Sequence, residues 1–275
     1  MSNAALRAVA SHFEFGKNWQ SFATTITAES LIEAKAGLAK LFPGDELTGA
    51  SFFDIGCGSG LSMLAAKELG AASVHGVDID PHSVRASQTV LTAHRPEGGW
   101  GCEVKSVFDL APETDGRHDI VHSWGVLHHT GDMWPAIEKA AALVKPGGLF
   151  ALALYRKTPL CEFWTWEKRL YTNAPAPVGM ALRLGYMALY VAGLIATGRN
   201  PFAYIRSYRS NRGMDWRHDV HDWLGGYPYQ STTPQEVAAF LDRLGFAMVR
   251  SFEKPAAVKG LFGTHCDEFV AIRTR

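Results

Sequence analysis

The chain has 275 residues, enough for one large domain or for a domain with a subdomain. Its formal net charge is zero and 47% of its residues are hydrophobic, so the composition is globular and gives no sign of a nucleic-acid partner. Four scattered cysteines without a C-x-x-C pair indicate reduced thiols rather than disulfides or a zinc site, and the first fourteen residues lack a signal-peptide pattern. We therefore expect a cytoplasmic protein without a bound metal.

Aromatic residues gather near the N-terminus, before a helix predicted over residues 28–41. They are Phe13, Phe15, Trp19 and Phe22. Two interpretations remain open for this segment. Either the rings pack on the core, or the segment forms a lid in which Phe15 and Trp19 exclude water and contact the substrate.

A buried strand, a tight turn and the start of a helix are predicted over residues 51–69. Glycine is needed where the backbone takes a positive φ or closely approaches a ligand, and the helix N–H groups face whatever lies over the loop. The glycine spacing differs from the dinucleotide pattern, and the Lys-Ser/Thr ending of a P-loop is missing. An acid ending the strand suits a ligand with an ammonium group. The candidate ligand-binding residues are Asp54, Gly56, Cys57, Gly58 and Gly60.

A second strand, predicted over residues 73–80, also ends in acids. Asp78 is placed to accept both hydroxyls of a ribose, and Ile79 lies next to it in the same candidate site. Asp80 precedes Pro81 and is assigned to capping the next helix. An acid, a glycine loop and a ribose-binding acid together describe a nucleoside that carries an amino acid. That ligand is S-adenosylmethionine.

The fourth strand is predicted over residues 118–124. Parallel sheets bind their ligands at the carboxyl ends of the strands, so we expect the segment from Trp124 to Thr130 to lie over the site, with Trp124 among the cofactor-binding residues. His128 and His129 are adjacent and point in different directions, which disfavours a metal pair. Either one of them acts as a general base, or they are structural histidines bonded to the backbone.

Four motifs in this order resemble those of class I S-adenosylmethionine-dependent methyltransferases. The third motif is similar to the fourth-strand motif of the quinone-biosynthesis, small-molecule branch. The resemblance is firm over residues 50–155 and loose over 233–275, and the segment 156–232 is similar to the middle of a branch of bacterial methyltransferases. The motifs are D-I-G-C-G-S-G from Asp54, G-V-D from Gly76, W-G-V-L-H-H from Trp124 and L-V-K-P-G-G-L from Leu143.

The resemblance implies that residues after the third strand, predicted over 102–107, flank the adenine of the cofactor. An acid there receives the adenine amino group. These roles fall on Phe108 and Asp109, and a helix-capping role for Asp109 stays open. The resemblance also favours the lid interpretation of the N-terminal aromatic segment.

The closing part of the sheet follows the pattern of the resembling family. A continuously apolar fifth strand is predicted over residues 149–154, as expected for a central parallel strand. A capped helix from Thr233 to Leu244 and an antiparallel pair at 246–252 and 268–272 come last. The predicted fold class is α/β, a Rossmann-like doubly wound sheet of about seven strands whose last strand is antiparallel.

About 75 residues separate the fifth strand from the final helix, too many for a bare loop, so we predict an inserted helical cap. The spacing of His218 and Asp222 allows an acid to orient a histidine base. Together with Trp223 and Tyr227 these residues form either a substrate-binding wall or an internal polar knot. The predicted sheet domain comprises residues 1–155 and 233–275, and the cap comprises residues 156–232.

Within the cap, residues 178–197 are almost wholly apolar and long enough to cross a bilayer. If this run crossed a bilayer, the final helix and hairpin would lie on the opposite side of the membrane from the rest of their own sheet. Arg183 also interrupts the apolar run. We expect a buried or partner-facing cap helix that does not span a membrane, and contact with a membrane surface remains a second interpretation.

These observations predict a methyltransferase that acts on a small molecule by in-line transfer to an O, N, S or C nucleophile and leaves S-adenosylhomocysteine as product. Two alternatives remain open. One is a membrane-associated methyltransferase of a lipid or quinone precursor, and the other is a non-catalytic S-adenosylmethionine-binding regulatory module. The sequence leaves the oligomeric state open between a monomer and a homodimer.

Overall fold

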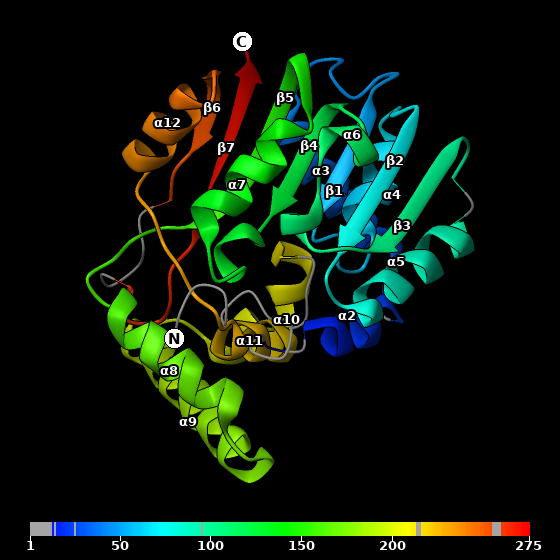
Figure 1. The fold of residues 1–275 in the computed structure, drawn as a ribbon. Helices are drawn as coiled ribbons and strands as arrows, with labels where there is room; N and C mark the ends of the chain where they lie inside the picture. The colour runs from blue at the N-terminus through cyan, green and yellow to red at the C-terminus, as the bar shows by residue number, and fades with distance from the viewer. Residues whose placement is uncertain (1–12, 14, 25, 95, 213–215, 255–259) are drawn as a thin grey trace.

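A seven-stranded sheet forms the centre of the computed structural model (Figure 1). The structure describes residues 13, 15–24, 26–94, 96–212, 216–254 and 260–275. The strands are β1 (Ser51–Ile55), β2 (Ser73–Asp78), β3 (Gly99–Val104), β4 (His118–Trp124), β5 (Val144–Tyr155), β6 (Phe246–Phe252) and β7 (Cys266–Arg273).

The strand order is β3-β2-β1-β4-β5-β7-β6, and β7 runs antiparallel to both of its neighbours. The predicted doubly wound sheet with an antiparallel last strand is therefore confirmed. Because β1 to β5 are parallel, their carboxyl ends meet at one edge of the sheet. Figure 1 shows α2 (Phe15–Ala23), α10 (Pro201–Arg212) and α11 (Trp216–Gly225) at this edge.

Helices cover both faces of the sheet and connect its strands. The side chains of Phe52 and Phe53 point to opposite faces because successive strand residues alternate. Phe52 belongs to a core with α3, α4 and α5, and Phe53 to a second core with α7 and α12. The helices of the sheet domain are α2 (Phe15–Ala23), α3 (Ala28–Leu41), α4 (Leu61–Glu68), α5 (Pro81–His94), α6 (Pro112–Asp115), α7 (Met133–Ala142) and α12 (Pro234–Arg243).

The chain between β5 and α12 folds as a helical insertion with an aromatic core of its own. Its helices are α8 (Cys161–Asn173), α9 (Ala176–Ala196), α10 (Pro201–Arg212) and α11 (Trp216–Gly225). The two ends of the insertion meet beside β5, where Lys157 N donates to Thr232 O (2.8 Å) and Thr232 N donates to Tyr155 O (3.0 Å). The sequence predicted a helical cap with one long apolar helix, and the structure adds α10 as a separate helix after it.

The third strand differs from its prediction. It begins at Gly99 and ends at Val104, three residues earlier at each end than predicted. The chain turns there because Lys105 N donates to Asp78 O (2.9 Å) and the Ser106 side chain caps a 3-10 turn, η2 (Val107–Asp109). A second turn, η3 (Leu127–His129), follows β4.

Among the described residues, one helix is long and apolar enough to cross a bilayer. This helix is α9, and only 6% of its most apolar window is buried. Figure 1 shows α8 and α9 side by side, projecting away from the sheet. Of the two predicted forms, the buried helix is therefore wrong, because one face alone of α9 packs on the protein, and the partner-facing helix stays a prediction.

Candidate functional site

The glycine loop after β1 is held in a single tight path. Gly56, Gly58 and Gly60 all have positive φ, of 77°, 53° and 78°. The N–H groups of Gly56 and Cys57 both donate to Val77 O, at 2.8 and 3.0 Å, which ties the loop to the end of β2. A side chain at Gly56 would lie 2.4 Å from Val126, so the loop also packs closely on the segment after β4.

Ser87 of α5 anchors the other side of this loop. Its Oγ lies 3.0 Å from Gly58 O and 3.3 Å from the sulfur of Cys57. A Cβ at Gly60 would come within 2.8 Å of Ser87 Cα, so glycine is required at the start of α4. A hydrogen bond with the nearby Cys102 thiol, followed by burial, raises the pKa of Cys57, which keeps it protonated beneath the loop.

Asp78 lies at the carboxyl end of β2, where the sequence placed the ribose-binding acid. One carboxylate oxygen accepts from Gly58 N at 3.2 Å and the other from Asp80 N at 2.9 Å. Burial raises the pKa of Asp78 to about 6, against the lowering effect of these two backbone donors. The carboxylate is therefore fixed next to the glycine loop and carries a strong preference for further hydrogen-bond donors.

Asp54 forms a buried pair that the sequence did not reveal. Its Oδ1 lies 2.8 Å from Nδ1 of His122 on the neighbouring β4, and both side chains are 3% exposed. Their strands pair directly, with Asp54 opposite His122. His122 thereby orients the acid that precedes the loop. The cofactor-binding role of Asp54 remains a prediction.

Three further predicted cofactor-binding residues follow β2 and β3, and the adenine role was assigned to the two after β3. Ile79 and Phe108 are partly buried, whereas Asp109 is exposed. The alternative that Asp109 caps a helix is wrong, because Ser106 caps η2 and Ala111 is the N-cap residue of α6. An exposed carboxylate at this point is free of a capping role, and the adenine assignment stays a prediction.

Trp124 ends β4 with its ring directed away from the loop. Its indole Nε1 donates to Glu268 of β7 at 3.1 Å, and the residue is 51% exposed. The ring thus reaches across β5 to the antiparallel strand. A cofactor contact by Trp124, as predicted, would have to come from its backbone in this arrangement.

The helix α2 lies over the glycine loop. The ring of Trp19 is 3.3 Å from the position of a Cβ on Gly58, and Gly16 N donates to Asp80 at 3.0 Å. Phe15 packs against His129, with ring centroids 5.4 Å apart. Both residues predicted as a lid therefore contact the loop or the segment after β4, and Asp80 bonds both α2 and His82 N in the first turn of α5.

The two histidines of η3 have different surroundings. His129 Nδ1 lies 2.8 Å from Pro228 O, the backbone contact expected of a structural histidine. His128 is fully buried, and neither ring nitrogen has a hydrogen-bond partner among the described residues. Burial, followed by His129 and Lys168, lowers the pKa of His128 well below its usual range. His128 is therefore a neutral imidazole with unused hydrogen-bonding capacity.

Tyr155, at the carboxyl end of β5, joins His128 to the cap. Its ring centroid lies 4.0 Å from that of His128 and 5.4 Å from those of Trp223 and Tyr229. Sequence reasoning missed this residue, although the rule that ligands bind at the ends of parallel strands applies to β5 as well as β4.

Lys168 is a second residue that the sequence did not single out. It is fully buried on α8, donates to the backbone oxygen of Trp223 and lies 3.6 Å above the centre of the Trp223 ring. Burial lowers the pKa of the Lys168 ammonium and raises that of neighbouring Glu167. The Trp223 Nε1 is buried without a partner among the described residues. No sequence pattern singled out this lysine as a candidate site residue, because it is one of the charged residues in a helix rich in aromatic residues.

The predicted pairing of His218 with Asp222 takes another form. Asp222 Oδ1 accepts from Asn18 of α2 at 2.8 Å, and His218 Nε2 lies 3.4 Å from Ser21 of the same helix. Burial raises the pKa of Asp222 well above its usual range. Tyr227 is buried, and its backbone oxygen accepts from Phe13 N at 3.0 Å. These bonds join α11 to α2 rather than to the sheet, and both the polar-knot interpretation and the catalytic and substrate-binding roles remain predictions.

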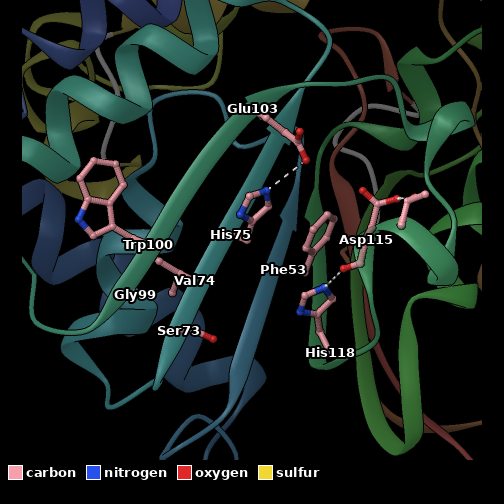
Figure 2. Close-up of a pocket in the computed structure, with 10 residues that line it drawn as sticks. Phe53, Ser73, Val74, His75, Gly99, Trp100, Glu103, Asp115 and His118 are labelled. Carbon is pink, nitrogen blue, oxygen red and sulfur yellow. Dashed lines mark hydrogen bonds and ion pairs between the residues drawn. The ribbon is translucent and has the colours of Figure 1, made fainter.

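A cavity of about 390 Å³ lies elsewhere, on one face of the sheet. Figure 2 shows Phe53 between His75 and His118, with Glu103 and Asp115 at the rim. The ring of Phe53 stacks on both histidines, at 5.6 and 4.6 Å. None of the predicted cofactor residues lines this cavity, so the candidate site is the edge formed by the glycine loop, η3, Tyr155 and the cap.

A family model described as a methyltransferase domain matches residues 28–251. A ubiquinone biosynthesis O-methyltransferase of Xanthomonas euvesicatoria pv. vesicatoria (strain 85-10) is 38% identical over 116 residues, 42% of this chain and 46% of that protein. The corresponding protein of Xanthomonas axonopodis pv. citri (strain 306) is 37% identical over 116 residues, with the same coverage of both chains. The match thus spans about half the length of these curated relatives.

Solved structures share the fold at low sequence identity. Magnesium protoporphyrin IX methyltransferase from Synechocystis PCC 6803, with bound SAH, aligns at a TM-score of 0.53 and 18% identity over 90% of this chain and 84% of its own. PKMT2 from Rickettsia typhi, in complex with AdoHcy, aligns at 0.56 and 14% identity over 83% of this chain and 49% of its own.

The sheet topology and the glycine loop therefore define a class I, Rossmann-like methyltransferase fold, as predicted. Because the family model covers most of the sequence, the chain belongs to the methyltransferase-domain family. The predictions of enzyme class and of S-adenosylmethionine as cofactor are confirmed at the level of this family, and the resemblance to the quinone-biosynthesis branch agrees with the curated relatives.

Proposed function

We propose that this protein transfers the methyl group of S-adenosylmethionine to a small-molecule acceptor held between the carboxyl edge of the sheet and the cap. The observation that carries the proposal is the fully buried His128 with two unpartnered ring nitrogens at the end of β4. Buried polar atoms are almost always hydrogen-bonded, so an unsatisfied pair at a ligand-binding edge calls for a ligand.

The residues present fit the cofactor. Its ribose hydroxyls would donate to Asp78, whose raised pKa reflects poor solvation that two hydroxyl donors would relieve. The positive-φ loop exposes backbone at the start of α4, and α2 covers that loop with Trp19. The cofactor supplies an activated methyl group, and the protein aligns the acceptor with it and excludes water, which is worth about 7–11 kcal/mol of the barrier.

The acceptor side of the site is built from His128, Tyr155, Trp223 and Lys168. Trp223 and His128 offer nitrogen atoms without partners among the described residues, and Lys168 places an ammonium in an aromatic enclosure. Such a set favours an acceptor with a polar, electron-rich atom over a purely apolar one. His128 is in the neutral form that a general base needs, and its lowered pKa makes it a weak base, so its two ring nitrogens serve first to hold the acceptor by hydrogen bonds.

The first test is calorimetric titration with S-adenosylmethionine and S-adenosylhomocysteine, with NADH as a control ligand. We expect micromolar binding of the two sulfur ligands alone. Gly58→Val should abolish this binding while circular dichroism remains native, because a β-branched residue is strained at a φ of 53° and would crowd Trp19. Equal binding of NADH, or binding by the valine variant, would contradict the proposal.

The second test identifies the acceptor by release of S-adenosylhomocysteine from a panel of phenols, amines, thiols and acids. Lys168→Met retains the length and apolar packing of the side chain and removes its charge. We expect this variant to raise the acceptor KM at unchanged cofactor affinity. A cytoplasmic location, predicted from the cysteines, remains part of this proposal.

A further inference from the structure

The outer surface of the cap is far more apolar than the rest of the protein. Of the fifteen large apolar side chains that are exposed in the described chain, ten lie between residues 163 and 205. Leu184 and Leu189, at 57% and 68% exposure, lie near the middle of α9. The ten are Phe163, Trp166, Leu170, Val178, Met180, Leu184, Leu189, Ile195, Phe202 and Ile205.

The exposed apolar side chains of α9 are not the ones that pack on the rest of the protein, because the opposite, inner face of α9 already makes those contacts. Tyr186 donates to Phe262 O at 2.9 Å, and the Tyr190 and Tyr204 hydroxyls lie 2.7 Å apart. Leu194 is buried, and Gly193 leaves room for the Phe262 ring 3.0 Å from where its Cβ would be. The exposed residues are therefore the outward side of a docked helix. Contiguous apolar surface of this kind marks an interaction site.

The charge along α9 and α10 is of one sign, and the exposed Glu162 lies outside them, at the start of α8. Residues 169–212 contain six arginines and neither aspartate nor glutamate, although the whole chain has a net charge of zero. Arg169, Arg199 and Arg206 are exposed, the first of them three residues after the exposed Trp166 and the others within four residues of the exposed Phe202. Apolar and aromatic side chains flanked by arginines are the composition of segments that lie on anionic lipid surfaces.

We propose that the outward surface of α8, α9 and the start of α10 docks the protein on an anionic phospholipid bilayer. In this arrangement α9 lies in the headgroup region with its exposed residues inserted and its inner face on the protein. The helix does not span the bilayer, because β5 before the cap and β7 after it pair in one sheet. A symmetric dimer through this surface would bring two arginine-rich faces together, so charge favours the lipid.

This docking goes beyond the proposed methyl transfer and does not require it. Trp164 Nε1 donates to Gly260 O at 2.7 Å, so α8 and α9 are attached to the sheet domain whether or not a ligand is bound. Lipid binding is therefore measurable without cofactor or acceptor, and its failure would leave the catalytic proposal untouched.

The test is vesicle flotation of the full chain with phosphatidylcholine alone and with phosphatidylcholine mixed with phosphatidylglycerol. We expect recovery with the anionic vesicles, weakened at high salt, and little recovery with the neutral ones. The double variant Leu184→Asp/Leu189→Asp should bind at least about tenfold more weakly, because carboxylates cannot enter an anionic apolar boundary. Arg199→Glu/Arg206→Glu should bind weakly for the electrostatic reason alone.

Ile32→Asp is the matched control, since Ile32 is 62% exposed on α3 and lies outside the cap. It should float like the wild type, and all variants should bind S-adenosylhomocysteine equally, which shows that they are folded. Wild-type protein that stays with neither vesicle, or a double variant that floats normally, would overturn the proposal. So would light scattering that shows a dimer which the Leu184→Asp/Leu189→Asp variant abolishes.

Discussion

The carboxylate of Asp78 combines a fixed position with a poor environment for charge. Two backbone N–H groups hold it in place, yet burial keeps its pKa near 6. A group in this state is stabilised by any ligand that donates hydrogen bonds to its ionised form. The affinity for the cofactor should therefore depend on pH in a range where few other carboxylates titrate.

We predict that S-adenosylhomocysteine binds progressively more weakly as the pH falls below about 6, by up to about tenfold per pH unit. The raised pKa means that the protonated form accumulates on acidification, and a protonated carboxyl loses acceptor capacity for the ribose hydroxyls. Calorimetry between pH 5 and pH 8 measures this. Asp78→Asn should bind more than tenfold more weakly at pH 7 and show a flatter pH profile; an affinity equal to wild type would remove Asp78 from the ribose site.

His128, unlike Asp78, has no hydrogen-bond partner for its side chain among the described residues, and its burial lowers the free energy of unfolding of the protein. Its two ring nitrogens are buried without partners among the described residues, and such groups cost about 1–3 kcal/mol each in desolvation. We predict that His128→Leu, which is close to isosteric, raises the free energy of unfolding and lowers turnover by at least about tenfold. Chemical denaturation and a methyl-transfer assay measure the two effects.

Measuring stability and turnover of His128→Leu together distinguishes a functional from a structural role of this histidine. A structural histidine would show the reverse, with lower stability and little change in turnover. Affinity for S-adenosylhomocysteine, measured alongside, should stay within about twofold of wild type, because His128 packs on Tyr155 rather than on the glycine loop.

At the scale of elements, α2 connects the two halves of the site. Trp19 lies against the glycine loop, Phe15 against His129, and Asn18 donates to Asp222 of α11. A helix that touches the cofactor loop and the cap at the same time can transmit closure from one to the other. The lid interpretation of the N-terminal aromatic segment thus has a physical route in the structure.

We predict that Trp19→Ala weakens S-adenosylhomocysteine binding by about tenfold, chiefly through faster dissociation, since it uncovers the loop. Stopped-flow dissociation measures this directly. Trp100→Ala is the control, because Trp100 belongs to β3 and lines the separate cavity of Figure 2. Identical dissociation rates for the two variants would refute a covering role for α2.

Sequence patterns located the elements of the sheet well and the contacts of the cap poorly. The strand that carries Asp54, the glycine loop and the capping box at Thr233 follow local rules, and the structure contains each of them. The partners of Lys168 and His122 depend on residues more than fifty positions away. Such pairings follow from tertiary packing and leave no periodic or spacing signal in one sequence.

The whole molecule consists of a sheet domain and an insertion that leaves and re-enters at neighbouring points. Because Tyr155 and Lys157 bond directly to Thr232, the sheet needs only a short connection there. We predict that replacing residues 158–231 with a short glycine-serine linker yields a folded protein that still binds S-adenosylhomocysteine, with affinity reduced by loss of the α11 contacts to α2.

The shortened protein should have no methyl-transfer activity on any acceptor accepted by the full chain, because Trp223 and Lys168 are removed with the cap. Calorimetry and the acceptor assay measure the two properties on the same sample. Complete loss of the folded state would show that the cap is part of a single cooperative unit, contrary to this prediction.

The junction at Thr232, where the two ends of the insertion meet, also has a consequence for the evolution of such proteins. A segment whose ends lie side by side can be lengthened, shortened or exchanged between genes without altering the register of any strand. Related proteins can therefore change their acceptor, and their location in the cell, by exchanging this one inserted segment. The cofactor loop, encoded far upstream, would be inherited unchanged through such exchanges.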